Sequence, residues 1–293
     1  MGQELLIELV SGCNLKCKMC AFKEGFTHQK MSKETIINVF KDIKYINQNS
    51  KFYNFTDIRL DGNSEPLLYE DLPFVMECAH GAGIENFNIT TNGVLLSREV
   101  SDQLLHSRLN TIDISMTGII PSVYSQFQGY GKPKKEVEKQ IETIIENVRY
   151  FVEHRQNQNI TVTMRYIITP YTQAHFREYI HFFKKLGADA VMGMTLTNVK
   201  LREKCKPYEE IVGRKSCESP EHPVICANGD VLLAFCPYEI PVLGNIFETP
   251  LTEIFMSKKT ETIISAFRRV DIDNLPENCQ NCYNTHIYKG GKW

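Results

Sequence analysis

Hydrophobic and polar positions follow two different periods along the first two-thirds of the chain. Short runs rich in apolar and β-branched residues are typical of strands, and longer stretches with apolar residues three and four apart are typical of helices. The predicted strands span residues 5–10, 56–60, 87–91, 111–116, 159–169 and 189–194. The predicted helices cover about 32–46, 69–82, 97–107, 135–156 and 173–186.

Strands that are separated by helices of this length indicate βαβ units and a parallel sheet. Six such units are too few to close an eight-stranded barrel. We therefore expect an α/β fold with a partial (β/α)6 TIM-like barrel, open along one side. In such sheets ligands bind at the carboxyl ends of the strands. The loops that follow the predicted strands are thus the first place to look for chemistry.

The pattern changes near residue 197, after which the chain is rich in loops and contains six of the ten cysteines. A hairpin is predicted within 223–235, with Asn228-Gly229 at the turn, and a single helix is predicted at about 250–268. We expect a barrel domain over 1–198 and a small cysteine-rich module over 199–293.

Composition limits the function. The 293 residues are 42% hydrophobic and 23% charged, with a formal net charge of -2, which favours a globular protein and gives no footprint for nucleic acid or anionic membrane. No apolar run is long enough to span a membrane, and the N-terminus lacks the pattern of a signal peptide. We expect a cytoplasmic protein, in which cysteine clusters indicate metal binding or catalysis rather than disulfides.

Three cysteines directly follow the first predicted strand. Cys13, Cys17 and Cys20 have the spacing Cys-x3-Cys-x2-Cys. Soft thiolates suit iron–sulfur centres, and three ligands on a four-iron cluster leave one iron open for a substrate or cofactor. The alternative is a structural zinc site, which usually takes four ligands in Cys-x2-Cys pairs.

With these cysteines the chain resembles the radical SAM superfamily over essentially its whole length. The segment LDGNSEPLL resembles the Gly-Gly-Glu-Pro motif of that family, which implies that the Glu65 carboxylate accepts from the amino group of S-adenosylmethionine (SAM), with Gly62 and Asn63 in close approach. The chain departs from the family at Asn63-Ser64, where glycines are common. It also has Met19 where an aromatic residue usually precedes the third cysteine.

The resemblance implies further SAM-binding positions on later strands: Thr91, Asn92, Ser115, Arg165, Met192 and Met194. Ser115 is implied to contact the ribose, although a hydroxyl at a strand end can equally bond to nearby backbone. Arg165 is implied to pair with the SAM carboxylate, which suits the fork of a guanidinium, against the alternative of a surface arginine. The two methionines are expected beside the adenine.

The C-terminal part resembles the SPASM/twitch accessory domain. The resemblance implies an auxiliary [4Fe–4S] cluster held by Cys217, Cys236, Cys279 and Cys282, and the cysteine count fits the single-cluster twitch version. Because Cys236 lies further from the hairpin glycine than is usual in the family, Cys226 is an alternative ligand. A structural zinc site is the alternative for the whole region.

The resemblance implies reductive cleavage of SAM to a 5′-deoxyadenosyl radical, which abstracts a hydrogen atom from the substrate, with a flavodoxin- or ferredoxin-type electron donor. Oxidation follows if the auxiliary cluster accepts an electron. Epimerisation follows if Cys226 or Cys205 returns a hydrogen atom, although for each of them taken singly a packed, inert thiol is the favoured interpretation.

We expect a small polar substrate, such as a sugar or an aminocyclitol, since only twelve residues precede Cys13 and no peptide-recognition domain is expected there. The alternative is a maturase that epimerises or crosslinks ribosomal peptides. A zinc- or iron–sulfur-binding protein without catalysis is the rival from another class, and it leaves Glu65, Ser115 and Arg165 without a role.

Overall fold

The computed structural model describes residues 2–20, 27–62, 64–155, 159–169, 171–195, 222–233, 242–269 and 271–282. These residues contain one nine-stranded sheet with the order β6-β5-β4-β3-β2-β1-β7-β8-β9. Its first six strands are parallel to one another and confirm the six predicted strands. They are β1 (Gln3–Ile7), β2 (Phe55–Leu60), β3 (Asn86–Thr91), β4 (Thr111–Ser115), β5 (Thr161–Ile168) and β6 (Ala190–Thr195).

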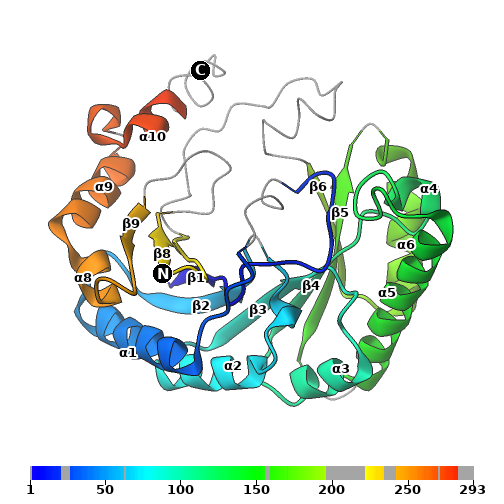
Figure 1. The fold of residues 1–293 in the computed structure, drawn as a ribbon, viewed down its shortest axis with the longest axis horizontal. Helices are drawn as coiled ribbons and strands as arrows, with labels where there is room; N and C mark the ends of the chain where they lie inside the picture. The colour runs from blue at the N-terminus through cyan, green and yellow to red at the C-terminus, as the bar shows by residue number, and fades with distance from the viewer. Residues whose placement is uncertain are drawn as a thin grey trace.

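Helices cover the outer side of the curved sheet, which stays open along one side (Figure 1). The five predicted helices are present as α1 (Lys33–Asn49), α2 (Leu72–Gly81), α3 (Arg98–Leu105), α5 (Lys134–His154) and α6 (Phe176–Leu186), joined by the short α4 (Pro121–Tyr124) and by 3-10 turns η1 (Pro66–Leu68) and η2 (Gln173–His175). As its sequence indicates, Ser32 caps α1 by accepting from the Thr35 amide. The expected partial barrel is confirmed.

Alternation along the parallel strands gives the sheet two unlike faces. On one face Ile58, Phe87 and Ile112 are fully buried and belong to the same core as the apolar sides of the helices. The intervening positions face the concave side, where Arg59 and Asp113 are examples. Polar residues are therefore concentrated inside the partial barrel.

The C-terminal residues continue the same sheet. The predicted hairpin is confirmed as β7 (Val224–Ile225) and β8 (Asp230–Leu232), with Gly229 at a φ of 88° in the turn. β7 pairs in parallel with β1, so the hairpin extends the barrel sheet. Strand β9 (Val242–Asn245), which pairs with β8, was not predicted. The predicted domain boundary lies outside the described residues.

The prediction of one helix over 250–268 is wrong. The segment forms α8 (Leu251–Met256) and α9 (Lys258–Arg269), which are separated at Ser257. Ser257 has extended backbone angles, and its hydroxyl accepts from the Thr260 amide at 3.1 Å. The serine therefore ends one helix and caps the next. The turn η4 (Ile272–Asn274) and helix α10 (Glu277–Cys282) follow.

Helix α8 is anchored on the first half of the barrel. The Asp42 carboxylate on α1 accepts from the Leu251 amide at 2.9 Å, so that it caps the N-terminus of α8. The Phe255 ring packs against Tyr53 and Phe55, with ring centroids 4.7 and 5.5 Å apart. In the part of the chain that the structure describes, no helix combines the length and the apolar character that a membrane crossing requires.

The aromatic contact predicts a large effect on stability. We expect Phe255→Ala to lower the free energy of unfolding by about 3–5 kcal/mol, because it leaves a cavity between α8 and β2. Phe247, which is 59% exposed, is the matched control, and its alanine variant should stay within about 0.5 kcal/mol of the parent. Urea unfolding of both variants checks this, and equal losses would contradict the anchoring role.

Candidate functional site

The cysteine loop lies at the carboxyl end of β1, as expected. Its three cysteines are half-buried, and it is held by a turn in which the Cys20 amide donates to the Cys17 carbonyl and by the Lys18 amide, which donates to the Phe127 carbonyl at 2.9 Å. Burial, together with the neighbouring charges of Cys13 and Cys20, raises the pKa of Cys17 to about 12. Cys13 and Cys20 thus lie close enough to Cys17 to act on its charge.

A buried carboxylate joins this loop to the ends of two strands. Glu65, only 2% exposed, accepts from the Thr91 hydroxyl at 2.6 Å and from the Asn92 amide at 2.8 Å. It also accepts from the Leu67 amide at 3.2 Å, and its own amide donates to the Gly12 carbonyl at 2.8 Å. Burial raises the pKa of Glu65 to about 7, against the lowering effect of these donors. Three segments therefore meet at this residue: the cysteine loop, the turn after β2 and the end of β3.

The Asn92 side chain extends the junction to the first cysteine. Its Nδ2 donates to Asn14 Oδ1 at 2.7 Å and lies 3.7 Å from Cys13 Sγ. Gly62 has a φ of 129°, a conformation that favours glycine, and a Cβ at this position would lie 3.4 Å from Glu8 Cβ. Asn63 lies outside the described residues. Met19 is half-buried in the turn before Cys20.

The other implied SAM-binding residues lie on β4, β5 and β6. Ser115 is the last residue of β4 and pairs across the sheet with Arg165 on β5. Arg165 pairs in turn with Met192 on β6. Met192 and Met194 are 48% and 39% exposed, which leaves them accessible on the concave side. The structure therefore brings these residues to adjacent strands, but away from the cysteine loop along the sheet.

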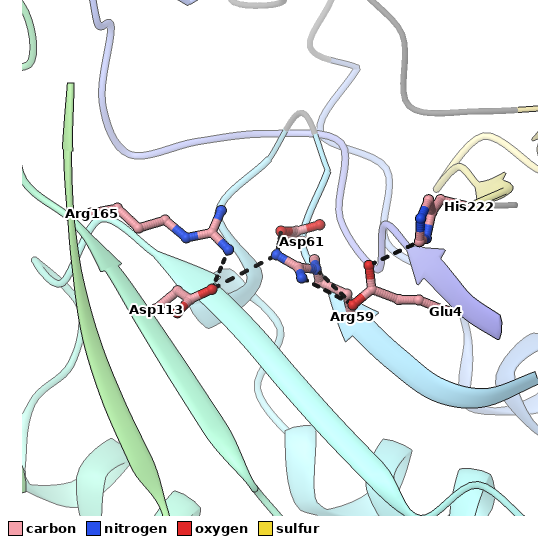
Figure 2. A network of polar contacts seen from close by, with 6 residues as sticks. All are labelled: Glu4, Arg59, Asp61, Asp113, Arg165 and His222. Carbon is pink, nitrogen blue, oxygen red and sulfur yellow. Dashed lines mark hydrogen bonds and ion pairs between the residues drawn. The ribbon is translucent and has the colours of Figure 1, made fainter. Parts of the chain in front are cut away.

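Arg165 is a member of a partly buried ion-pair network rather than a surface arginine (Figure 2). Its Nη2 donates to Asp113 on β4, and Asp113 lies 3.7 Å from Arg59 Nη1 on β2. Arg59 also pairs with Glu4 on β1 at 3.0 Å. Asp61, at the end of β2, lies 3.9 Å from Arg59 Nη1, and burial raises the pKa of Asp61 to about 6 despite the two arginines.

Sequence reasoning missed the acids of this concave face, above all Glu8, Asp61 and Asp113. A signal was present. Each is a charged residue within or directly after a strand-like run that contains buried apolar residues, and a buried charge of this kind is retained only when it is paired or functional. Motif matching passes over such residues, because it selects only positions that the family marks.

The C-terminal cysteines are described only in part. Cys279 lies half-buried on α10, packed against the core. The side chain of Cys282 and the residues Cys205, Cys217 and Cys236 lie outside the described residues. Cys226 directly follows β7, half-buried, and burial raises its pKa to about 12, assisted by the charges of Glu8 and Asp230.

Comparison with known proteins places this geometry in a family. The profile of the radical SAM superfamily matches residues 7–183, more than half of the chain, and the profile of the SPASM iron–sulfur cluster-binding domain matches residues 217–283. The chain belongs to the radical SAM superfamily and has a C-terminal SPASM domain. The resemblance seen in the sequence is confirmed.

Individual relatives are more distant. The chain is 31% identical to the GTP 3′,8-cyclase of Picosynechococcus sp. over 126 residues, which cover 43% of this chain and 37% of that protein. It thus spans less than half the length of the curated relatives that it matches.

Among solved structures, anSMEcpe with bound AdoMet and the Cp18Cys peptide is similar, with a TM-score of 0.66 and 17% identity over 99% of this chain and 89% of that chain. BtrN in complex with AdoMet and 2-DOIA has a TM-score of 0.53 and 14% identity, over 100% of this chain and 97% of that chain. At these identities the likeness supports the partial barrel fold and not a shared substrate.

The residues present suit the cofactors of the family, which are SAM, a SAM-binding [4Fe–4S] cluster and auxiliary iron–sulfur clusters in the SPASM domain. Burial and the charges of neighbouring groups raise the pKa values of the Cys13 and Cys17 thiols, and a cationic cluster would stabilise their thiolate forms. The described residues contain no group of three His, Cys, Asp or Glu suited to one metal ion, and a four-iron cluster is wider than one ion. The buried Nε of Arg165, without a hydrogen-bond partner among the described residues, suits the SAM carboxylate.

The cysteine assignment predicts a selective loss of iron. We expect Cys17→Ala to lower the iron content of the anaerobically reconstituted protein by about four irons per chain, because two thiolates do not retain the cluster. Cys78→Ala is the matched control, since Cys78 is a half-buried cysteine on α2 that packs against the core, and its iron content should equal that of the parent. Iron analysis of both variants checks this, and unchanged iron in Cys17→Ala would contradict the assignment.

Proposed function

We propose that this radical SAM enzyme abstracts a hydrogen atom from a small polar substrate, such as a sugar or an aminocyclitol, and thereby oxidises or epimerises it. The observation that carries the proposal is the charged concave face. Glu8 and Asp61 directly follow the adjacent strands β1 and β2 at the carboxyl edge, where ligands of such sheets bind, and Glu8 is 7% exposed. Buried charges of this kind suit a substrate with many hydroxyl or amino groups.

The proposal assigns a role to each candidate site residue. When bound, the reduced cluster and SAM supply the 5′-deoxyadenosyl radical, with electrons from a flavodoxin- or ferredoxin-type donor. We propose that Cys13, Cys17 and Cys20 hold the cluster and that Glu65 accepts from the SAM amino group. We assign the auxiliary cluster to Cys217, Cys236, Cys279 and Cys282.

The rest of the SAM site is proposed on the strand ends. Gly62 and Asn63 give the backbone close approach, Thr91 and Asn92 hold Glu65, and Ser115 contacts the ribose. Met192 and Met194 lie beside the adenine, and Arg165 pairs with the SAM carboxylate. The buried, unpartnered Nε of Arg165 supports the last assignment most directly.

A peptide substrate is the second candidate. The support for it is the fold shared with anSMEcpe, whose structure contains the Cp18Cys peptide, while BtrN, with 2-DOIA bound, supports the small-molecule alternative.

A substrate panel tests the proposal. With SAM and dithionite, we expect polyhydroxylated or amino-substituted cyclitols or sugars to raise the rate of 5′-deoxyadenosine release above the rate without substrate, because a bound substrate commits the radical to reaction. The release is measured by chromatography, with Cys17→Ala as the inactive control. Stimulation by short peptides, with no response to any polyhydroxylated compound, would contradict the small-molecule proposal and favour the peptide candidate.

The fate of the substrate radical depends on Cys226. This residue continues β7, in which Val224 pairs with Leu6, and alternation directs its side chain to the concave side near Glu8. A pKa of about 12 keeps the thiol protonated, as a hydrogen-atom donor requires. The thiol would deliver its hydrogen atom to the substrate radical, and the thiyl radical would then take up an electron from the donor and a proton.

Reaction in deuterated water separates epimerisation from oxidation. If Cys226 donates, the exchanged thiol places one deuterium on carbon in a product of otherwise unchanged composition, and Cys226→Ala abolishes that incorporation. Mass spectrometry of the product checks this. A product that is two hydrogens lighter and is formed equally by Cys226→Ala would establish oxidation and remove Cys226 from the chemistry.

A further inference from the structure

The inference concerns Asp113, which lies between two half-buried arginines on the concave face (Figure 2). Residues Asp113 and Arg165 point to the same face, because Asp113 is two positions before Ser115, which pairs with Arg165. The side chain of Asp113 is 9% exposed, and the side chains of Arg165 and Arg59 are 17% and 23% exposed. The carboxylate is therefore well shielded from water and is shared by both guanidinium groups.

The contacts of Asp113 are unequal. Its Oδ2 accepts a hydrogen bond from Arg165 Nη2 and lies 3.7 Å from Arg59 Nη1. Arg59 donates its hydrogen bonds to Glu4 instead, through Nε at 3.1 Å and Nη2 at 3.0 Å. Arg59 is thus fixed mainly by Glu4. Arg165 has Asp113 as its ion-pair partner among the described residues.

The contact leaves part of the guanidinium of Arg165 available. Its Nε is buried and has no hydrogen-bond partner among the described residues. A buried donor without an acceptor is unfavourable, and a guanidinium binds a carboxylate best through two parallel N–H donors. An arginine side chain has many rotamers, so that one fixed nitrogen greatly reduces the number of positions that the others adopt.

We infer that Asp113 is a positioning residue that holds Arg165 by Nη2 and so directs the remaining N–H groups to the carboxylate of SAM. The inference rests on the proposed role of Arg165. It differs from simple charge neutralisation, for which the position of the carboxylate would matter little.

Two substitutions separate position from charge. Asp113→Asn retains the shape and an oxygen that accepts from Nη2 but removes the charge. Asp113→Glu retains the charge but displaces the carboxylate by one methylene. Asp57→Asn is the control. Asp57 lies on the same face of β2 as Arg59, but it accepts from the Thr56 hydroxyl at 2.5 Å and not from Arg165.

The measurement is equilibrium binding to the anaerobic holoprotein with oxidised clusters, so that no cleavage occurs. The two probes are SAM and decarboxylated SAM, which has the same sulfonium and adenosine but no carboxylate. We expect Asp113→Glu to raise the Kd of SAM by about tenfold and that of decarboxylated SAM by less than about threefold. We expect Asp113→Asn and the control to bind both probes within about threefold of the parent, or SAM more tightly in the case of Asp113→Asn.

The outcomes are distinguishable. Unchanged SAM binding in Asp113→Glu, equal weakening for both probes, or selective loss of SAM binding in Asp113→Asn but not in Asp113→Glu would each overturn the positioning role. Arg165→Ala tests the parent assignment separately. If Arg165→Ala weakens the binding of SAM more than that of decarboxylated SAM, while Asp113→Glu does not, only the inference about Asp113 fails. If Arg165→Ala does not distinguish the probes, the proposed role of Arg165 fails and the inference about Asp113 fails with it.

Discussion

The site depends on the buried carboxylate of Glu65. A carboxylate with 2% exposure is unfavourable unless donors surround it, and here the Thr91 hydroxyl and the Asn92 and Leu67 amides provide them. Because these donors come from the end of β3 and from the turn after β2, the acid fixes two strand ends at once. The Glu65 amide adds the cysteine loop through the Gly12 carbonyl. The loop that carries the three thiols is thereby held against the sheet at a defined place.

A second constraint acts on the other side of the concave face. The strands turn their apolar residues to the helices, so that polar residues accumulate inside, where they are partly shielded from water. Such charges persist when they are paired, and the chain from Glu4 through Arg59 and Asp113 to Arg165 pairs them (Figure 2). The network crosses β1, β2, β4 and β5 beneath the carboxyl edge, and it leaves the buried Nε of Arg165 for a ligand. A paired network and a hydrogen-bond donor without a partner in the described part of the chain, the Nε of Arg165, thus occur together on the face where SAM is proposed to bind.

Much of this was predictable from the sequence, for identifiable reasons. The six parallel strands and five helices between them have strong periodicity, and the spacing of Cys13, Cys17 and Cys20 is a local signal. The failures have equally local causes. The apolar period of 250–268 continues across Ser257, although that residue caps a new helix, and β9 has only four residues, one of them glycine. The pairing of Asp113 with Arg165 depends on the register of β4 against β5, which no pattern within either strand contains.

The central claim is that three thiolates leave one iron open for SAM to bind. The most direct measurement is electron paramagnetic resonance with nuclear hyperfine detection on the reduced protein, with SAM whose amino nitrogen is ¹⁵N. Direct ligation predicts a ¹⁵N coupling to the cluster held by Cys13, Cys17 and Cys20, which unlabelled SAM does not give. A reduced cluster whose spectrum is the same with labelled SAM, unlabelled SAM and no SAM would contradict the account.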